Sequence, residues 1–479
     1  MFLGLDLGTS GLRALLIDDG QQTVGEATAP LDVTRPHDGW SEQDADSWIA
    51  AAELALSQLG ASHDLSAVQG VGLSGQMHGA TLLDETDKPL RPCILWNDTR
   101  SHAEAAEMDA DPKWREISGN IVFPGFTAPK VEWVRRNEPE IFARVRRVLL
   151  PKDYLRLWLT GEAVSDMSDS AGTSWLDTGD RNWSDSLLQV SGLDRSQMPR
   201  LVEGSEVSGR VRAEIASRFG LKANVPVAGG AGDNAATAIG LGIARAGEGF
   251  VSLGTSGVLF AACDTYAPAS ETAVHTFCHA LPETWHQMGV ILAAADALTW
   301  LSRLTGKSSA DLTAGLENLE APGHALFLPY LGGERTPHND ADVRGSFLGL
   351  SHATDTEAAT RAVLNGVAFA FKDCLDALSA TGTRFDTLIA AGGGSASRVW
   401  IEAIATALQI RIEVPRVSSV GAAQGAARLG LMAATGAGPQ VAARPEIAET
   451  IDPNETLIAA YAEGHERFKD AYKAVKEVS

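Results

Sequence analysis

The stretch Leu7-Gly8-Thr9-Ser10-Gly11 occurs a second time as Leu253-Gly254-Thr255-Ser256-Gly257, identical at all five positions. The two copies are separated by about half of the chain. Apolar stretches typical of strands flank both copies, at 2–6 and 12–18 and again at 250–253 and 258–262. The shared strand context predicts an internal duplication. Two ordinary hairpin turns are the alternative interpretation.

Short apolar stretches alternate with alanine-rich helical segments along the chain, which predicts an α/β fold. Further strands are expected at 68–73 and 225–228, and helices at 46–59, 130–137, 235–241 and 457–478. The glycine- and alanine-rich stretch 242–249 precedes the second pentamer. We expect the domain boundary there, giving an N-terminal domain 1–242 and a C-terminal domain 243–479, with this stretch as the candidate hinge.

Composition limits the classes of function. The 479 residues carry 39 basic and 61 acidic side chains, a formal net charge of −22, which disfavours a nucleic-acid partner. Four cysteines without a CxxC pair predict free thiols in a reducing cytoplasm. We expect neither a signal peptide nor a membrane span, and therefore a cytoplasmic protein.

The repeated pentamer suits phosphate binding. Glycine lets the backbone approach a ligand closely, and the Thr and Ser hydroxyls add donors beside the backbone N–H groups. Two such loops facing each other across a cleft could hold a polyphosphate, which suits phosphoryl transfer. Only the first copy follows an acid, Asp6. A carboxylate beside phosphate needs a cation between them, so we expect Mg²⁺ near Asp6, held through water. A plain turn-forming Asp is the alternative interpretation.

Asp233 stands in the string Gly-Gly-Ala-Gly-Asp-Asn-Ala-Ala, between a buried-type strand and a helix. Ligands of α/β folds bind where strands end, so this acid could accept the proton of a substrate hydroxyl. An Asp that only caps the helix is the alternative. The glycines at 229, 230 and 232 favour close approach of a ligand.

Together these features resemble the FGGY carbohydrate kinases, whose fold is related to actin and hexokinase. The strings that resemble the family signatures lie at 126–133, at 345–350 followed by 361–371, and at 391–395. Five further strings resemble bacterial family members that act on xylulose: 74–81, 94–100, 149–157, 165–169 and 331–339. The resemblance implies two duplicated ribonuclease H-like lobes with a cleft between them.

The resemblance also implies MgATP-dependent phosphorylation of D-xylulose on its C5 hydroxyl. Asp233 would be the general base, and Asp6 would act near Mg²⁺ and the γ-phosphate. The implied sugar contacts are Gln76, Met77, His78 and Asn234. The implied phosphate contacts are Thr9, Ser10, Arg13, Thr255 and Ser256. The implied adenosine contacts are Gly393, Gly394 and Ser397. A homodimer is a family-level expectation.

Several alternatives remain open. Another pentulose or polyol could be the substrate, although Met77-His78 replaces the Arg-Glu pair of glycerol kinases. An actin-like nucleotide-dependent sensor would need no catalytic acid. A zinc site at His275, Cys278 and His279 fits no common spacing. The glycines at 392–394 mimic a dinucleotide fingerprint with Glu413 downstream, but its third glycine is missing.

Overall fold

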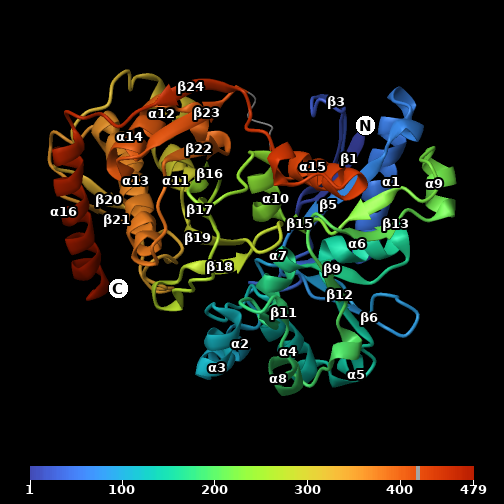
Figure 1. Cartoon of the computed structure of the whole chain (residues 1–479). Coiled ribbons are helices and arrows are strands. Elements are labelled where there is room, and N and C mark those ends of the chain that lie inside the picture. The colour runs from blue at the N-terminus through green and yellow to red at the C-terminus, as the bar shows by residue number, and fades with distance from the viewer. Residues whose placement is uncertain (417–420, 479) are drawn as a thin grey trace.

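The computed structural model describes residues 1–416 and 421–478. Within these residues the chain forms two halves, each built on a seven-stranded sheet (Figure 1). The first sheet has the order β13-β14-β5-β1-β2-β3, and β15 pairs with β5. Its strands are β1 (Phe2–Leu7), β2 (Gly11–Ile17), β3 (Thr23–Pro30), β5 (Gly70–Gly75), β13 (Val207–Arg210), β14 (Pro226–Ala228) and β15 (Ala231–Gly232).

The second sheet has the order β18-β19-β17-β16-β22-β23-β24. Its strands are β16 (Glu248–Leu253), β17 (Gly257–Cys263), β18 (His275–Cys278), β19 (Trp285–Ile291), β22 (Thr387–Ala391), β23 (Arg411–Pro415) and β24 (Ile447–Ile451). In the described residues, ten short strands lie outside the two sheets: β4 (Glu42–Gln43), β6 (Thr81–Leu83), β7 (Cys93–Ile94), β8 (Arg147–Leu149), β9 (Val164–Asp166), β10 (Leu176–Asp177), β11 (Asn182–Trp183), β12 (Arg200–Val202), β20 (Leu326–Leu328) and β21 (Ser346–Leu348).

The two copies of the pentamer occupy equivalent places in the two sheets. The first joins the antiparallel pair β1 and β2, and the second joins the antiparallel pair β16 and β17. On its other side β1 pairs in parallel with β5, just as β16 pairs in parallel with β22. The prediction of a duplicated α/β fold is therefore confirmed, and the pentamers are more than two unrelated turns.

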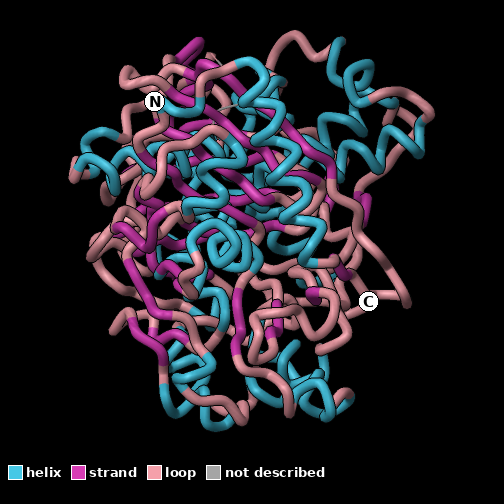
Figure 2. Tube along the Cα trace, turned by 90° about the vertical axis from the view of Figure 1, so that its right-hand side faces the viewer, coloured by secondary structure: helices cyan, strands magenta, loops and turns pink. Residues whose placement is uncertain are grey.

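Helices cover the sheets, and Figure 2 shows them lying over the strands on the viewer's side. The α-helices of the first half are α1 (Ala45–Ser62), α2 (His102–Asp109), α3 (Pro112–Ser118), α4 (Thr127–Asn137), α5 (Pro139–Phe142), α6 (Pro151–Thr160), α7 (Met167–Ser170), α8 (Asp185–Val190), α9 (Ala213–Phe219) and α10 (Asp233–Gly240). Those that follow are α11 (Ala295–Thr305), α12 (Ser309–Ala314), α13 (Thr356–Ala380), α14 (Arg398–Leu408), α15 (Ala422–Thr435) and α16 (Ile458–Lys476). All of the expected strands and helices named above are present, with ends shifted by a few residues.

Each sheet has its own apolar core. In the first half Leu5 and Leu73 of the sheet pack with Trp48 of α1. In the second half Phe371 of α13 and Trp400 of α14 belong to one buried cluster with strand residues of the sheet. Strands that are buried on both faces carry nearly continuous apolar runs, as β1 does.

Helix α15 belongs to the C-terminal part of the sequence but packs on the first sheet and against α10 (Figure 1). Its backbone lies so close that only glycine fits beneath it. A Cβ atom on Gly72 would lie 1.7 Å from the carbonyl oxygen of Ala426, and one on Gly4 would lie 2.1 Å from that of Ala423. The predicted boundary stretch 242–249 follows α10, and its last two residues are the first two of β16.

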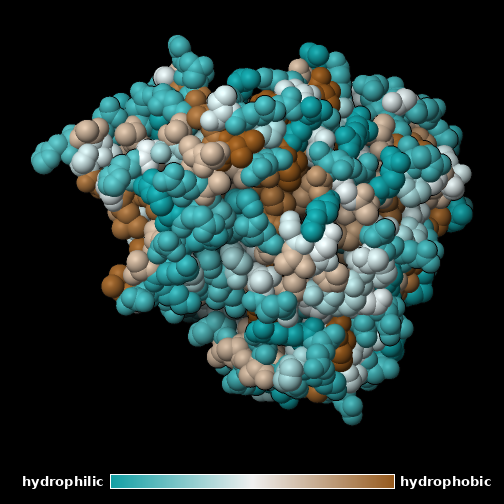
Figure 3. Space-filling model, turned by 60° about the vertical axis from the view of Figure 1, so that its left-hand side comes forward, coloured by the Kyte–Doolittle hydropathy of each residue, from teal (hydrophilic) through white to brown (hydrophobic). Residues whose placement is uncertain are grey.

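The face shown in Figure 3 is mostly hydrophilic, with hydrophobic residues confined to small areas. None of the helices in the described part of the chain is long and apolar enough to cross a membrane.

Candidate active site

Three strand ends of the first sheet bring the predicted catalytic acids to one edge. Asp6 of β1 is in register with Ser74 of β5, and Ser74 is in register with Ala231 of β15. Because these pairings are parallel, all three strands run toward the same edge. The Met77-His78 loop follows β5 there, and Asp233 begins helix α10 directly after β15.

Asp233 is half-buried and has one oxygen fixed by its neighbour. Its Oδ1 accepts a hydrogen bond from the backbone N of Asn234 at 2.7 Å and another from Asn234 Nδ2 at 3.0 Å. Burial, and then the negative charge of Asp6, raise the pKa of Asp233 to about 6. Near neutral pH this carboxylate is ionised and still basic, as a general base requires.

The peptide before Asp233 is held in place by buried polar groups. Gly232 N donates to Ser168 Oγ at 3.1 Å, and Ser168 Oγ donates to Asp166 Oδ2 at 2.5 Å. Lys152, fully buried, pairs with Asp166 at 2.7 Å and also with Asp153 and Asp169. This network fixes the backbone that carries the candidate base.

Asp6 is half-buried, and burial raises its pKa, although the nearby Ser74 hydroxyl and the charge of Arg13 oppose that rise. Its negative charge in turn helps to raise the pKa of Asp233. Two carboxyl groups close enough for one to raise the pKa of the other form a site that can bind a divalent cation. The residues present therefore fit a Mg²⁺ ion held through water.

His78 has a left-handed backbone, with φ of +71°, that a side-chain-bearing residue rarely adopts. Its ring stacks on Phe126, and Nδ1 lies 2.7 Å from the carbonyl oxygen of Gly172. A carbonyl only accepts, so Nδ1 carries the proton and Nε2 is left as an acceptor. Burial, together with the charge of Lys130, lowers the pKa of His78 to about 3. The imidazole is therefore neutral.

Two side chains of α4 hold the His78 backbone. Lys130 Nζ donates to the carbonyl oxygen of His78 at 3.0 Å and to that of Gly125 at 2.6 Å. Thr127 Oγ1 donates to the same His78 oxygen at 3.0 Å. Burial lowers the pKa of Lys130 to about 7. Met77 is buried beside His78, against two glycines: a Cβ on Gly232 would lie 2.8 Å from Met77 Sδ, and one on Gly172 would lie 3.0 Å from Met77 Cε.

Gln76 turns toward the first pentamer. Its Oε1 accepts a hydrogen bond from Thr9 Oγ1 at 2.9 Å, and its Nε2 donates to Gln43 Oε1 at 2.9 Å. Gln43 Nε2 donates to the carbonyl oxygen of Thr9 at 2.7 Å, and Trp96 Nε1 donates to Thr9 Oγ1 at 3.0 Å. Gln76 thus holds the loop in place, and its predicted sugar contact stays a prediction.

The other predicted phosphate contacts lie near the two loops. Ser10, Thr255 and Ser256 are exposed. The carbonyl oxygen of Thr255 accepts from the backbone N of Ala294 at 2.9 Å, which ties the second loop to the start of α11. Arg13 pairs with Glu26 at 2.5 Å.

The predicted adenosine motif lines a cavity of about 210 Å³ at the end of β22, together with Val414 and Pro415. Gly393 lies in its wall, and a Cβ there would meet nothing within 4 Å. Gly394 instead packs on the second pentamer, because its Cβ would lie 2.7 Å from Cβ of Leu253. Ser397 directly precedes α14 and is not among the residues that line this cavity.

His275, Cys278 and His279 have protein neighbours. His275 Nε2 lies 3.4 Å from Nη1 of Arg335, and Cys278 Sγ contacts the carbonyl oxygen of Thr178 at 3.6 Å. His279 packs at an angle on Phe260.

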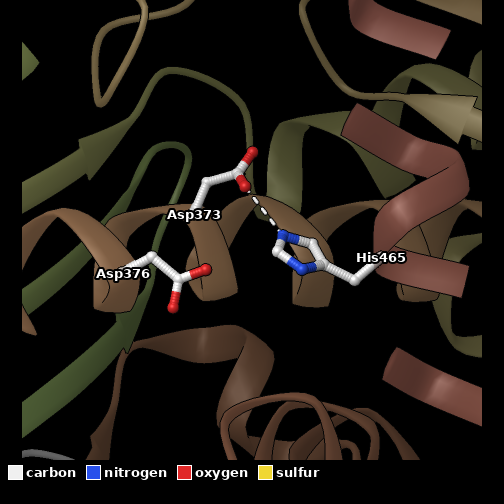
Figure 4. A group of neighbouring side chains, drawn as sticks. All are labelled: Asp373, Asp376 and His465. Atoms are coloured by element: carbon white, nitrogen blue, oxygen red, sulfur yellow. Dashed lines mark hydrogen bonds and ion pairs between the residues drawn. The ribbon is translucent and has the colours of Figure 1, made fainter. Parts of the chain in front are cut away.

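In the described residues, the group whose geometry could accept a metal ion is Asp373, Asp376 and His465, between α13 and α16 (Figure 4). His465 bonds Asp373 at 2.7 Å and Asp376 pairs with Lys372, so these side chains partner one another. We assign no metal to them.

Sequence reasoning missed four residues that shape the site: Gln43, Trp96, Thr127 and Lys130. Trp96, Thr127 and Lys130 fall inside strings that resemble the family, but only the structure shows that they hold Thr9 and His78.

The duplicated halves, with a Gly-Thr-Ser loop in each, place the chain in the actin- and hexokinase-like fold class. Comparison with known proteins identifies the family within this fold class. A model of the N-terminal domain of the FGGY family of carbohydrate kinases matches residues 1–240, and a model of its C-terminal domain matches residues 249–434. The chain belongs to the FGGY family of carbohydrate kinases.

Similar proteins include a xylulose kinase of Escherichia coli (strain K12), 45% identical over 478 residues that cover 99% of each chain. The solved structure described as a "xyloylose kinase" from Brucella ovis is 61% identical, with a TM-score of 0.99 and full coverage of both chains. A xylulose kinase structure from Rhodospirillum rubrum is 29% identical with a TM-score of 0.93, covering 100% of this chain and 99% of that one.

Proposed function

We propose that this carbohydrate kinase transfers the γ-phosphoryl group of ATP to the C5 hydroxyl of D-xylulose, with Asp233 as the general base. The names of the similar proteins support the sugar. The observation that carries the mechanism is the state of Asp233, which is half-buried, has a pKa of about 6 and has one oxygen fixed by Asn234. Its second oxygen is the acceptor for the substrate proton.

The transfer requires few chemical groups from the protein. As the C5 oxygen attacks the γ-phosphorus, its proton passes to Asp233 and the bond from phosphorus to the ADP oxygen breaks. Xylulose 5-phosphate and ADP result, and Asp233 returns its proton to water. Mg²⁺ near Asp6, held through water, would neutralise phosphate charge. His78 offers a neutral ring acceptor to a sugar hydroxyl, with Met77 and Asn234 beside it.

The nucleotide would extend between the halves. Adenosine would enter the cavity beside Gly393, where alanine, valine and proline side chains offer apolar contact. The phosphates would then meet Thr255 and Ser256 on one side and Thr9 and Ser10 on the other. Movement about the stretch 242–249 would close the site and exclude water, a competing nucleophile. A cytoplasmic homodimer remains a prediction.

The test is ADP release with xylulose, ribulose, glycerol and gluconate, for the wild type and Asp233→Ala. The exposed Asp342→Ala serves as the matched control. We expect preference for xylulose, a loss of turnover of about a hundredfold or more in Asp233→Ala, and no loss in the control. Undiminished turnover in Asp233→Ala would show that Asp233 is not the general base. Preference for another substrate would show that xylulose is not the substrate. ATP binding without sugar-dependent turnover would favour a nucleotide-dependent sensor.

A further inference from the structure

Arg428 of α15 is a buried cation without a carboxylate partner in the described part of the chain. Only 4% of its surface is exposed. Burial alone lowers its pKa, to about 10, and no acid opposes that shift. Lys152, by contrast, is buried among three aspartates. A buried charge is costly unless something offsets it, so the surroundings of Arg428 call for an explanation.

One nitrogen of the guanidinium caps the C-terminal end of α10. Arg428 Nη1 donates to the carbonyl oxygens of Ile239 at 2.9 Å and Gly240 at 2.7 Å, the last residues of α10. The negative end of the helix dipole offsets part of the charge. Nε has no hydrogen-bond partner among the described residues, and Nη2 forms no hydrogen bond or ion pair with any of them. Nε and Nη2 form the edge with which arginine binds two oxygens of one phosphate or carboxylate.

Arg428 also lines a cavity of about 460 Å³, within the size range of small-molecule sites. The other walls are the turn between β2 and β3, Gln424 of α15, and the segment 443–446 that leads into β24. Arg444 adds a second guanidinium, which pairs with Glu413 at 3.2 Å and with Glu248 at 3.8 Å yet keeps 42% of its side chain exposed. The two positive groups favour an anion here.

The remaining polar groups of the wall fit a ligand that also carries hydroxyls. Gln21 has a buried Oε1 that lacks a donor among the described residues. Each of the two acids of the wall has its own arginine partner, because Glu26 pairs with Arg13 at 2.5 Å and Glu446 pairs with Arg416 at 2.7 Å. The wall therefore offers cations to an anion and a carbonyl acceptor to a hydroxyl.

We propose that this cavity is a second ligand site, apart from the ATP and sugar sites, that binds a small phosphate ester of a polyol or sugar. The phosphate contacts Arg428 and Arg444, and a hydroxyl donates to Gln21. The ligand touches the first sheet through the β2–β3 turn and the second through the segment before β24. It also orders Arg428, which holds the last residues of the helix that begins at Asp233. Binding alone is independent of the proposed function, whereas an effect on turnover rests on it.

The experiment is calorimetric titration with ribose 5-phosphate and with inorganic phosphate, with excess ADP occupying the nucleotide site. The variants are Arg428→Lys, which keeps the charge but loses the two-nitrogen edge, Arg444→Gln and Gln21→Ala. Exposed Arg303→Gln is the matched control. We expect the ester to bind at least tenfold more tightly than phosphate, and each wall variant to weaken it about tenfold or more, with the control unchanged.

The side chains of Arg444 and Gln21 form no hydrogen bond with the α10 carbonyls, so Arg444→Gln and Gln21→Ala test the site even where Arg428→Lys disturbs the fold. Melting temperature gives a second readout, since the ester should raise it in the wild type and not in the wall variants. Equal affinity in wild type and wall variants, or no binding by the wild type, overturns the site. Equal binding of phosphate and ester overturns the hydroxyl contact. ADP release with xylulose measures the kinase activity and so tests the proposed function independently of this second site.

Discussion

Asn234 donates two hydrogen bonds to the same oxygen of Asp233, from its backbone N at 2.7 Å and from its Nδ2 at 3.0 Å. One carboxylate oxygen is therefore held by the adjacent residue, and the other is left for a substrate. Both bonds favour the ionised form and oppose the burial and the Asp6 charge that raise the pKa of Asp233 to about 6.

Activity should follow the ionisation of Asp233. We expect kcat/KM to fall below about pH 6, because a protonated carboxyl cannot accept the hydroxyl proton. His78, with a pKa of about 3, stays neutral across this range and adds no second step. In Asn234→Ala the loss of a bond that lowers the pKa should move the acid limb to higher pH. Exposed Asn318→Ala is the control, and an unmoved limb in Asn234→Ala would contradict the coupling.

Asp233 should also reduce stability. A carboxyl whose pKa is raised by folding binds its proton more tightly in the folded state, so stability falls as pH rises from the unfolded value toward 6. Asp233→Asn removes this charge and should increase the free energy of unfolding by about 1–3 kcal/mol at pH 8. The gain should shrink toward pH 4, where the folded wild type is protonated and the unfolded chain is about half protonated. Urea unfolding at the two pH values measures it, and a less stable variant at pH 8 refutes it.

Gly172 should be needed for sugar binding. A Cβ there would lie 2.4 Å from Cε1 of His78 and 2.5 Å from Nδ1. Gly172→Ala should displace the ring and raise KM for the sugar about tenfold, with little change in KM for ATP. Gly315→Ala is the control, because a Cβ there meets nothing within 4 Å. Equal changes in both KM values would show a general disturbance instead.

Much of the fold could be predicted because its signals are local. The strands around both pentamers follow from apolar runs and turns, and Asp6 and Asp233 stand at strand ends that the sequence marks with glycine. Helix α15 could not be placed in this way. Its position on the first sheet depends on glycines at 4 and 72, far away in sequence, that let backbone meet backbone.

Within the site, the unpredicted residues are those that act through another residue. Trp96 reaches Thr9, and Lys130 reaches the carbonyl oxygen of His78. The sequence pattern around these two residues does not predict either contact. Gln76 shows the same limit, since its place next to Met77 does not reveal that its amide faces Thr9.

Trp96 should therefore matter for the nucleotide. Its Nε1 donates to Thr9 Oγ1 at 3.0 Å although 47% of the residue is exposed. Trp96→Phe keeps the apolar surface and removes the donor, so the first phosphate loop loses one of its supports. We expect KM for ATP to rise severalfold while KM for xylulose changes less. Steady-state kinetics with each substrate varied in turn measures this, and an unchanged KM for ATP argues against the role.

The close contact between α10 and α15 gives the sharpest prediction about stability. A Cβ on Gly425 would lie 1.7 Å from the carbonyl oxygen of Ala236, a backbone atom that cannot move aside without shifting α10. Gly425→Ala should lower the free energy of unfolding by about 3 kcal/mol or more, despite the better helix propensity of alanine. Gly323→Ala, where a Cβ meets nothing within 4 Å, is the matched control and should change stability little. Because α10 begins with Asp233, the activity that remains in folded Gly425→Ala should fall as well. A variant as stable and active as the wild type would mean that the two helices are free to separate, and that the position of the base does not depend on their contact.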